Sequence, residues 1–83
     1  MVIETQPDIL AYTVIIKPDP ESPGWWNAEV PALPGCVSCG QSYDEALAMV
    51  REAMEGFIQA MLEHGDPLPP DVMSARVPAK VAA

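Results

Sequence analysis

The sequence predicts a small α+β domain in which a three- to four-stranded antiparallel sheet carries one long helix on one face. Two runs near the start, residues 10–17 and 25–30, are rich in β-branched and aromatic residues, as strands are. Apolar residues then recur with helical spacing over residues 46–62. The length of 83 residues fits one domain with a marginal core that oligomerisation would stabilise. The expected element order is β-β-β-α-β.

The predicted strands are separated by proline-rich turns. The first spans Leu10–Lys17, the second Trp25–Val30 and the third Cys36–Cys39. A short fourth strand over Val72–Val77 is expected to join an edge of the sheet. Consecutive strands before a single helix favour an antiparallel meander.

The domain is expected to occupy residues 10–77, after an N-terminal extension over residues 1–9 and before a tail over residues 78–83. The chain lacks an apolar run long enough to span a membrane, and its N-terminus lacks the charged and apolar regions of a secretory signal. A cytoplasmic location is therefore predicted.

The alternation of side chains along a strand assigns residues to the two faces of the sheet. The set expected to face the helix in the second strand comprises Trp26, Ala28 and Val30. Trp25, Asn27 and Glu29 then lie on the open face with Thr13 and Ile15. Because an exposed tryptophan is uncommon and enriched at interfaces, we expect Trp25, Asn27 and Glu29 to contact a partner or a second copy.

The long helix has clear start and stop signals. Ser42 and Glu45 form a capping box, in which each side chain is expected to bond the backbone N–H of the other residue. The helix should end near His64, with Gly65 as its C-terminal cap residue. Its apolar positions are Ala46, Leu47, Val50, Ala53, Met54, Phe57, Ile58, Met61 and Leu62. With Met49, Gly56 and Ala60 this stripe is wider than one sheet face covers, which leaves room for a second subunit in a homodimer or homotetramer.

The chain is acidic, with twelve acids, four bases and a formal net charge of −8. This balance argues against direct binding of nucleic acid, which requires clustered Lys and Arg. It favours a basic partner, because long-range attraction speeds encounter. From charge alone, solubility is the simpler explanation of the acidity.

No catalytic, metal-binding or cofactor-binding set is evident. Cys36 and Cys39 form a C-x-x-C, but a structural zinc site takes four ligands and only His64 remains among the soft ones. Positions three apart in a strand also point to opposite faces, so we interpret both cysteines as small buried thiols. Glu29 is the sole strand acid, which argues against a nuclease site.

Several spaced residues resemble the HicB-like antitoxin family, whose pattern is an aromatic strand, P-x-L-P-G-C, a glycine, a Ser or Thr helix cap and E-A. In this sequence the matching residues are Trp26, Pro31, Leu33, Pro34, Gly35, Cys36, Gly40, Ser42, Glu45 and Ala46. The resemblance covers residues 10–77. It implies an α+β fold comparable with a partial RNase H or a double-stranded-RNA-binding domain.

The resemblance also implies a function. HicB-like antitoxins bind a small basic RNase toxin, HicA, and occlude its RNA-cutting site without catalysis. Many members carry a C-terminal DNA-binding domain, whereas only a short tail follows residue 77 here, so DNA binding and autoregulation are not carried over. The alternative hypothesis is a non-catalytic homo-oligomeric structural or binding module without a toxin partner.

Overall fold

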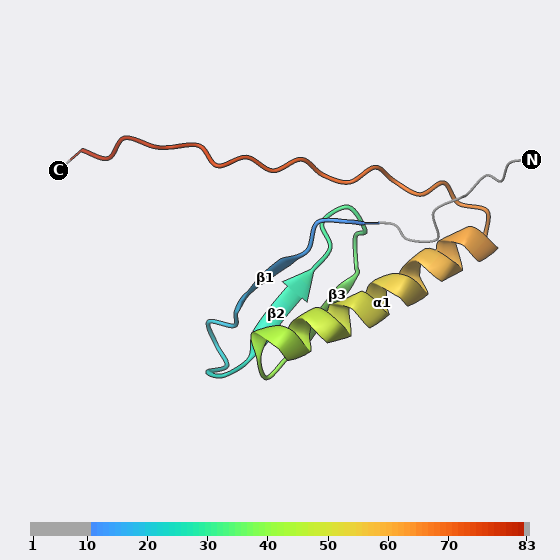
Figure 1. Cartoon of the computed structure of the whole chain (residues 1–83), viewed down its shortest axis with the longest axis horizontal. Coiled ribbons are helices and arrows are strands. Elements are labelled where there is room, and N and C mark those ends of the chain that lie inside the picture. Colours follow the sequence, from blue (N-terminus) through green and yellow to red (C-terminus); the bar gives the residue numbers. More distant parts are fainter. Residues whose placement is uncertain (1–10, 83) are drawn as a thin grey trace, which may run out of the picture.

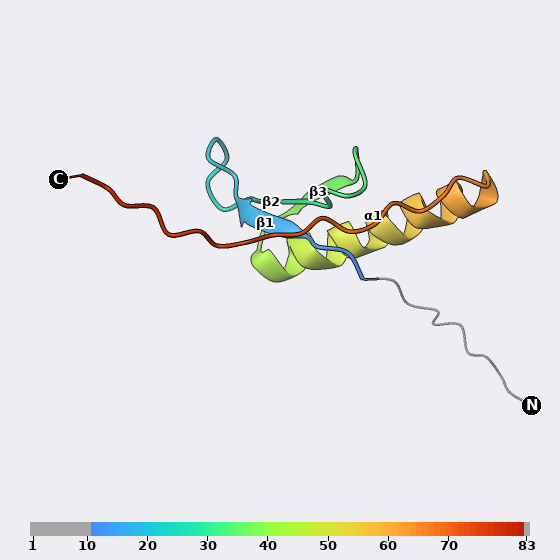
Figure 2. The same ribbon diagram turned by 90° about the horizontal axis from the view of Figure 1, so that it is seen from above.

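A computed structural model describes residues 11–82, in which three strands precede one helix. The elements are β1 (Ile15–Pro18), β2 (Trp26–Glu29), β3 (Val37–Gly40) and α1 (Tyr43–Glu63). The strands pair antiparallel in the order β1-β2-β3, and α1 lies across one face of the sheet (Figures 1 and 2). The predicted α+β class and meander are therefore confirmed. The predicted N-terminal extension and Leu10 lie outside the described residues.

The strands are shorter than the sequence predicts, because local turns and distant contacts take the flanking backbone groups. Trp25 belongs to the preceding turn, where its N–H donates to the carbonyl of Ser22 at 3.0 Å. Cys36 likewise closes the turn before β3, donating to the carbonyl of Leu33 at 2.9 Å. β1 begins at Ile15 and not at Leu10, since Thr13 is engaged by the segment that follows the helix.

That contact joins two parts of the chain that are distant in sequence. The carboxylate of Asp71 accepts from the backbone N–H of Thr13 at 2.9 Å and from its hydroxyl at 2.7 Å. The hydroxyl of Tyr12 donates to the carbonyl of Pro69 at 2.6 Å. These bonds, which we call the clasp, hold the chain after α1 beside the segment that leads into β1.

The predicted fourth strand over Val72–Val77 is wrong for this structure, since no strand follows α1 within residues 11–82. Pro69, Pro70 and Pro78 flank this span on both sides, and none of them has the N–H that would extend a strand ladder beyond it. Every hydrogen bond of the clasp involves a side chain, so the clasp does not start a ladder of backbone-to-backbone hydrogen bonds. Beyond it the chain runs extended past the body of the domain (Figures 1 and 2).

The connection from β2 to β3 supplies the centre of the core. Leu33 is fully buried, and its backbone is held by a bond from its N–H to the carbonyl of Val30 at 2.9 Å. Gly35 has a φ of 91°, which confirms the turn conformation expected there. The buried apolar residues of the core are Ala28, Val30, Leu33, Cys36, Ala46 and Val50. The predicted inward set of β2 is thus confirmed, with Trp26 packed at its margin.

The helix starts on a modified capping box. The hydroxyl of Ser42 accepts from the N–H of Glu45 at 3.0 Å, as predicted. The carboxylate of Glu45, however, accepts from the N–H of Gln41 and not of Ser42. Gly40 lies against this first turn, and the side chain of Glu45 reaches one residue further back along the chain. One extra backbone donor is therefore satisfied just before the cap.

The helix ends as the sequence predicts. Gly65 has a φ of 74°, and its N–H donates to the carbonyl of Leu62. The N–H of Asp66 donates to the carbonyl of Met61. These two bonds form a Schellman motif, which stops the helix and directs the chain back toward the sheet.

The second half of α1 extends beyond the sheet. Twenty-one helical residues span about 31 Å, whereas strands of four residues span about 13 Å. Leu62 is exposed although it was predicted to lie in the buried stripe, and Met49 is exposed as well. A Cβ at Gly56 would meet no atom within 4 Å, so no backbone approaches it in the described chain. Apolar helix surface therefore remains uncovered.

Gly40 and Gly56 provide a matched pair of substitutions. A Cβ at Gly40 would lie 2.5 Å from the backbone nitrogen of Ala46, so Gly40→Ala must displace the start of α1. We expect this variant to lower the free energy of unfolding by about 1–3 kcal/mol. Gly56→Ala should raise it by about 0.5–1 kcal/mol, because it adds helix propensity without a clash. Urea unfolding measures both, and equal stability of Gly40→Ala and the parent chain would contradict the close packing.

The clasp predicts a measurable titration. The hydroxyl and then the backbone N–H of Thr13 hold the pKa of Asp71 below its ordinary value. The clasp therefore contributes stability above the unfolded-state pKa of Asp71 and loses it as the pH falls through the folded-state pKa. NMR titration should show the pKa of Asp71 rising in Thr13→Val. An unchanged pKa would show that the hydroxyl does not bind the carboxylate in solution.

Candidate functional site

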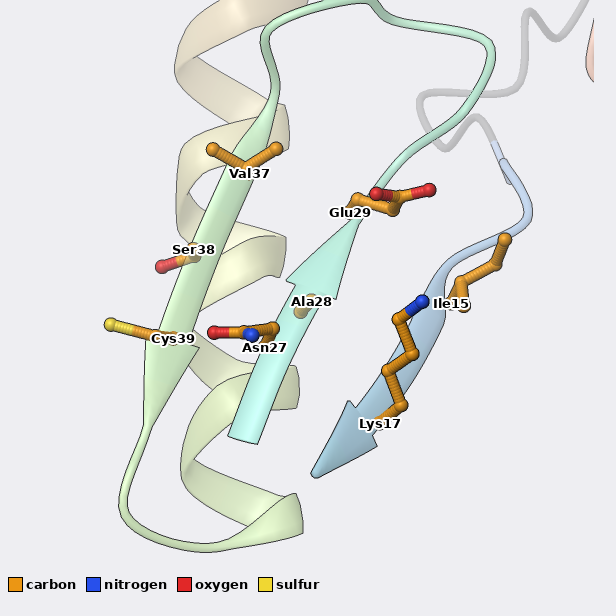
Figure 3. A pocket seen from close by; sticks show the side chains of 8 residues that line it. All are labelled: Ile15, Lys17, Asn27, Ala28, Glu29, Val37, Ser38 and Cys39. Atoms are coloured by element: carbon orange, nitrogen blue, oxygen red, sulfur yellow. The ribbon is translucent and has the colours of Figure 1, made fainter. Parts of the chain in front are cut away.

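The face of the sheet opposite α1 is open and forms a shallow groove of about 480 Å³. The strand register places its outward side chains in two rows that cross all three strands (Figure 3). The first row is Ile15, Glu29 and Val37, and the second is Lys17, Asn27 and Cys39. Backbone of Ala28 and Ser38 completes the floor between the rows.

The first row combines apolar surface with one negative charge. Ile15 is 41% exposed and Val37 63% exposed, and the carboxylate of Glu29 stands between them (Figure 3). The second row carries an amide, a thiol and the ammonium of Lys17. A surface that offers apolar contact, an amide and one charge of each sign, on Glu29 and Lys17, is suited to binding another protein.

The structure bears on each predicted contact residue. Asn27 and Glu29 line the groove as expected from the alternation of β2. Trp25 is 39% exposed and lies just before β2, outside the groove lining. Val37 and Cys39 were not predicted as members of this face. Their signal was available in the sequence, since residues alternating with the buried Cys36 must point outward.

The sequence matches a known protein family over most of its length. Residues 12–80 match the model of a family described as the HicB-like antitoxin of bacterial toxin-antitoxin systems. The chain belongs to the HicB-like antitoxin family. The match covers most of the chain and includes every residue on which the sequence resemblance rests.

Similar curated proteins come from archaea and a cyanobacterium. A UPF0150 protein of Thermoplasma acidophilum is 39% identical over 62 residues, which cover 75% of this chain and 87% of that protein. One from Synechocystis is 34% identical over 65 residues, covering 78% and 80% of the two chains. One from Archaeoglobus fulgidus is 32% identical over 50 residues, covering 60% and 70%. No solved structure matches significantly.

The HicB-like motif builds the fold and does not form the groove. Leu33, Cys36 and Ala46 are core residues, and Gly40 lets β3 approach α1. The ring of Trp26 meets that of Tyr43 edge-on, with centroids 5.9 Å apart. The remaining motif residues shape the turn or cap the helix, and they are Pro31, Pro34, Gly35, Ser42 and Glu45. The groove is therefore lined by residues outside the motif.

The two cysteines differ in their surroundings. Cys36 is buried, and burial raises the pKa of its thiol. Cys39 is exposed in the groove, so the expectation that both thiols are buried is wrong for Cys39. The reason is the alternation of β3, which places positions three apart on opposite faces. Both are free thiols.

Two further observations concern the described part of the chain. No helix in residues 11–82 has the length and apolar character needed to cross a membrane. Within the same residues, no three His, Cys, Asp or Glu side chains gather in a way that could hold a metal ion.

The cysteines give a direct test of which face is open. A maleimide reagent should label Cys39 rapidly and Cys36 only when the protein unfolds, because exposure controls access of the reagent. Mass spectrometry after brief labelling should show one adduct in the parent chain and none in Cys39→Ser. Rapid double labelling of the folded parent chain would contradict the burial of Cys36.

Proposed function

We propose that this HicB-like protein is an antitoxin that binds a small basic RNase toxin of the HicA type on its open sheet face. Membership of the antitoxin family supports the general role. The observation that carries the location of the contact is the groove itself, which exposes Ile15 and Val37 around Glu29 on the face that α1 leaves free.

Electrostatics support a basic partner. The net charge of −8 attracts a positively charged protein over a distance of about one Debye length, close to 8–10 Å at physiological salt. Such attraction accelerates encounter and selects partners more than it strengthens the final complex. The apolar side chains of Ile15 and Val37, on either side of Glu29, then supply contact area that charge alone does not.

Inhibition in this proposal is steric. The face of the sheet covers the RNA-cutting site of the toxin, and Glu29 competes with RNA phosphates for a basic side chain of that site. The antitoxin itself catalyses nothing. Trp25, Asn27 and Glu29 are the proposed contact residues, with Ile15 and Val37 as apolar support.

The first experiment identifies the partner. The tagged chain is recovered from its native lysate at low and at high salt, and proteins bound in stoichiometric amount are identified by mass spectrometry. We expect one small basic protein that is lost as salt rises. The purified pair should then show RNA cleavage that the antitoxin suppresses. Recovery of the chain alone would favour the homo-oligomeric module instead.

Matched charge reversals then locate the contact. Glu29→Lys should weaken toxin binding about tenfold, equivalent to ~1.4 kcal/mol, because it places a positive charge against a basic surface. Glu52→Lys makes the same change in net charge on an exposed position of α1 and should have little effect. Trp25→Ala should weaken binding without altering far-UV circular dichroism. Equal effects of both reversals would place the contact elsewhere.

A further inference from the structure

The two edges of the sheet are protected to different degrees. β1 ends in Lys17 and Pro18, a charge and an imino acid of the kind that discourage pairing with another strand. β3 has the sequence Val-Ser-Cys-Gly and carries neither device. It lies within an uncharged stretch, residues 30–43, although the chain as a whole is 19% charged. Native edges are normally guarded, so an unguarded edge indicates a strand that receives a partner.

The hydrogen-bond register shows what β3 offers. The N–H of Val30 donates to the carbonyl of Cys36 at 3.0 Å, which places even-numbered residues of β3 toward β2. Val37 and Cys39 therefore direct their N–H and C=O groups away from β2. No strand of the described chain lies on that side. The edge of β3 presents two donors and two acceptors in strand geometry.

The edge of β1 is a poorer acceptor. The N–H of Asp19 donates to the carbonyl of Trp25 at 2.8 Å, so Ile16 and Pro18 are the residues whose backbone faces outward. Pro18 has no N–H to donate. β1 thus offers one outward donor, half as many as β3.

Residues 72–82 have a strand-like sequence pattern but pair with no strand of the described chain. They run extended (Figures 1 and 2), and their odd-numbered positions share one side of an extended chain. That side is apolar throughout, with Met73, Ala75, Val77, Ala79 and Val81, whereas the other side includes Ser74, Arg76 and Lys80. Met73 is 97% exposed, Val77 80% and Val81 86%. Alternation of this kind is the pattern of a half-buried strand.

This segment does not lie along β3 of its own chain in the structure, where no strand follows α1 within residues 11–82. The clasp anchors its start at Asp71 beside Thr13, on the β1 side of the sheet. β3 forms the opposite edge. A second copy of the chain has the same free edge and no such constraint.

Charge also favours a second copy. All twelve acids of the chain lie in residues 1–71, whereas residues 72–82 contain Arg76 and Lys80 and no acid. Asp44 and Glu45 lie in the first turn of α1, shortly after β3. The segment is therefore attracted to the acidic body of another copy as it is to its own, and in a dimer this attraction opposes the repulsion between the two acidic bodies.

We propose that residues 72–82 add as a strand to the β3 edge of a second copy, and that reciprocal exchange produces a closed two-fold dimer. Pro78, which lacks an N–H, is accommodated because the added strand becomes the new edge. The apolar side of the segment then packs beside Val37. The dimer leaves the groove residues Asn27 and Glu29 of each copy accessible, and Val37 is the one groove residue that both the added strand and the proposed toxin contact would use.

The mass of the purified full chain, measured by sedimentation equilibrium, tests the proposal. We expect the full chain to be dimeric and a chain truncated after Asp71, which retains the clasp, to be monomeric. Val77→Lys should raise the Kd of self-association about tenfold or more. Ser74→Lys adds the same charge to the other side of the segment and should leave the Kd of self-association unchanged. Far-UV circular dichroism and thermal unfolding confirm that each variant is folded.

Mixing distinguishes exchange of the segment from pairing between two β3 edges. The truncated chain keeps a free edge, and Val37→Lys keeps the segment but carries a charge on the edge. Each should be monomeric alone, and the mixture should form a one-to-one heterodimer. A monomeric full chain, a dimeric truncated chain, or a mixture without heterodimer would each overturn the proposal.

Discussion

The burial of Leu33 between the sheet and the helix is the contact on which the rest of the structure depends. Removing a leucine side chain from water contributes about 1.5–3 kcal/mol. Leu33 is buried because the Pro-Ala-Leu-Pro-Gly turn folds under the sheet, where Val30 and Cys36 are already bonded to each other. The same turn sets the register of β2 with β3 and brings Gly40 against the first turn of α1. The residues of the HicB-like motif are therefore the ones that build this packing arrangement.

Within residues 11–82 only six apolar residues are fully buried, which is a small core. The buried residues of α1, Ala46 and Val50, lie in its first half, while Phe57, Ile58 and Met61 of its second half pack only partly buried against the core. The open face, the end of α1 and the extended segment 72–82 remain in contact with solvent. A protein with this distribution of apolar surface is suited to act by association. This fits the role of an antitoxin, which needs a stable frame and a surface but no reactive centre.

The groove and the edge of β3 differ in chemistry. Because of this difference we propose a different partner for each. The groove combines apolar side chains with the charges of Glu29 and Lys17, and it is the proposed site for a basic protein. The β3 edge is uncharged and offers backbone groups, which suits a strand. Because one is a face and the other an edge of the same sheet, the two sites share only Val37. Pairing at the edge would also widen the sheet whose face is the proposed toxin site.

The features that depend on local interactions could be predicted from the sequence alone. The caps Ser42 and Gly65, the span of α1 and the inward set of β2 follow from neighbouring residues, and each is present as predicted. The same alternation assigns Asn27 and Glu29 to the open face, where they line the groove. Tertiary structure decided what depends on residues far apart. Thr13 meets Asp71 across 58 positions, which moves the start of β1 and keeps Val72–Val77 out of the sheet. The exposure of Cys39 and Leu62 likewise depends on where the short sheet and the long helix stop covering each other. Periodicity specifies which side of an element is apolar, but only packing specifies how much of that side finds a partner.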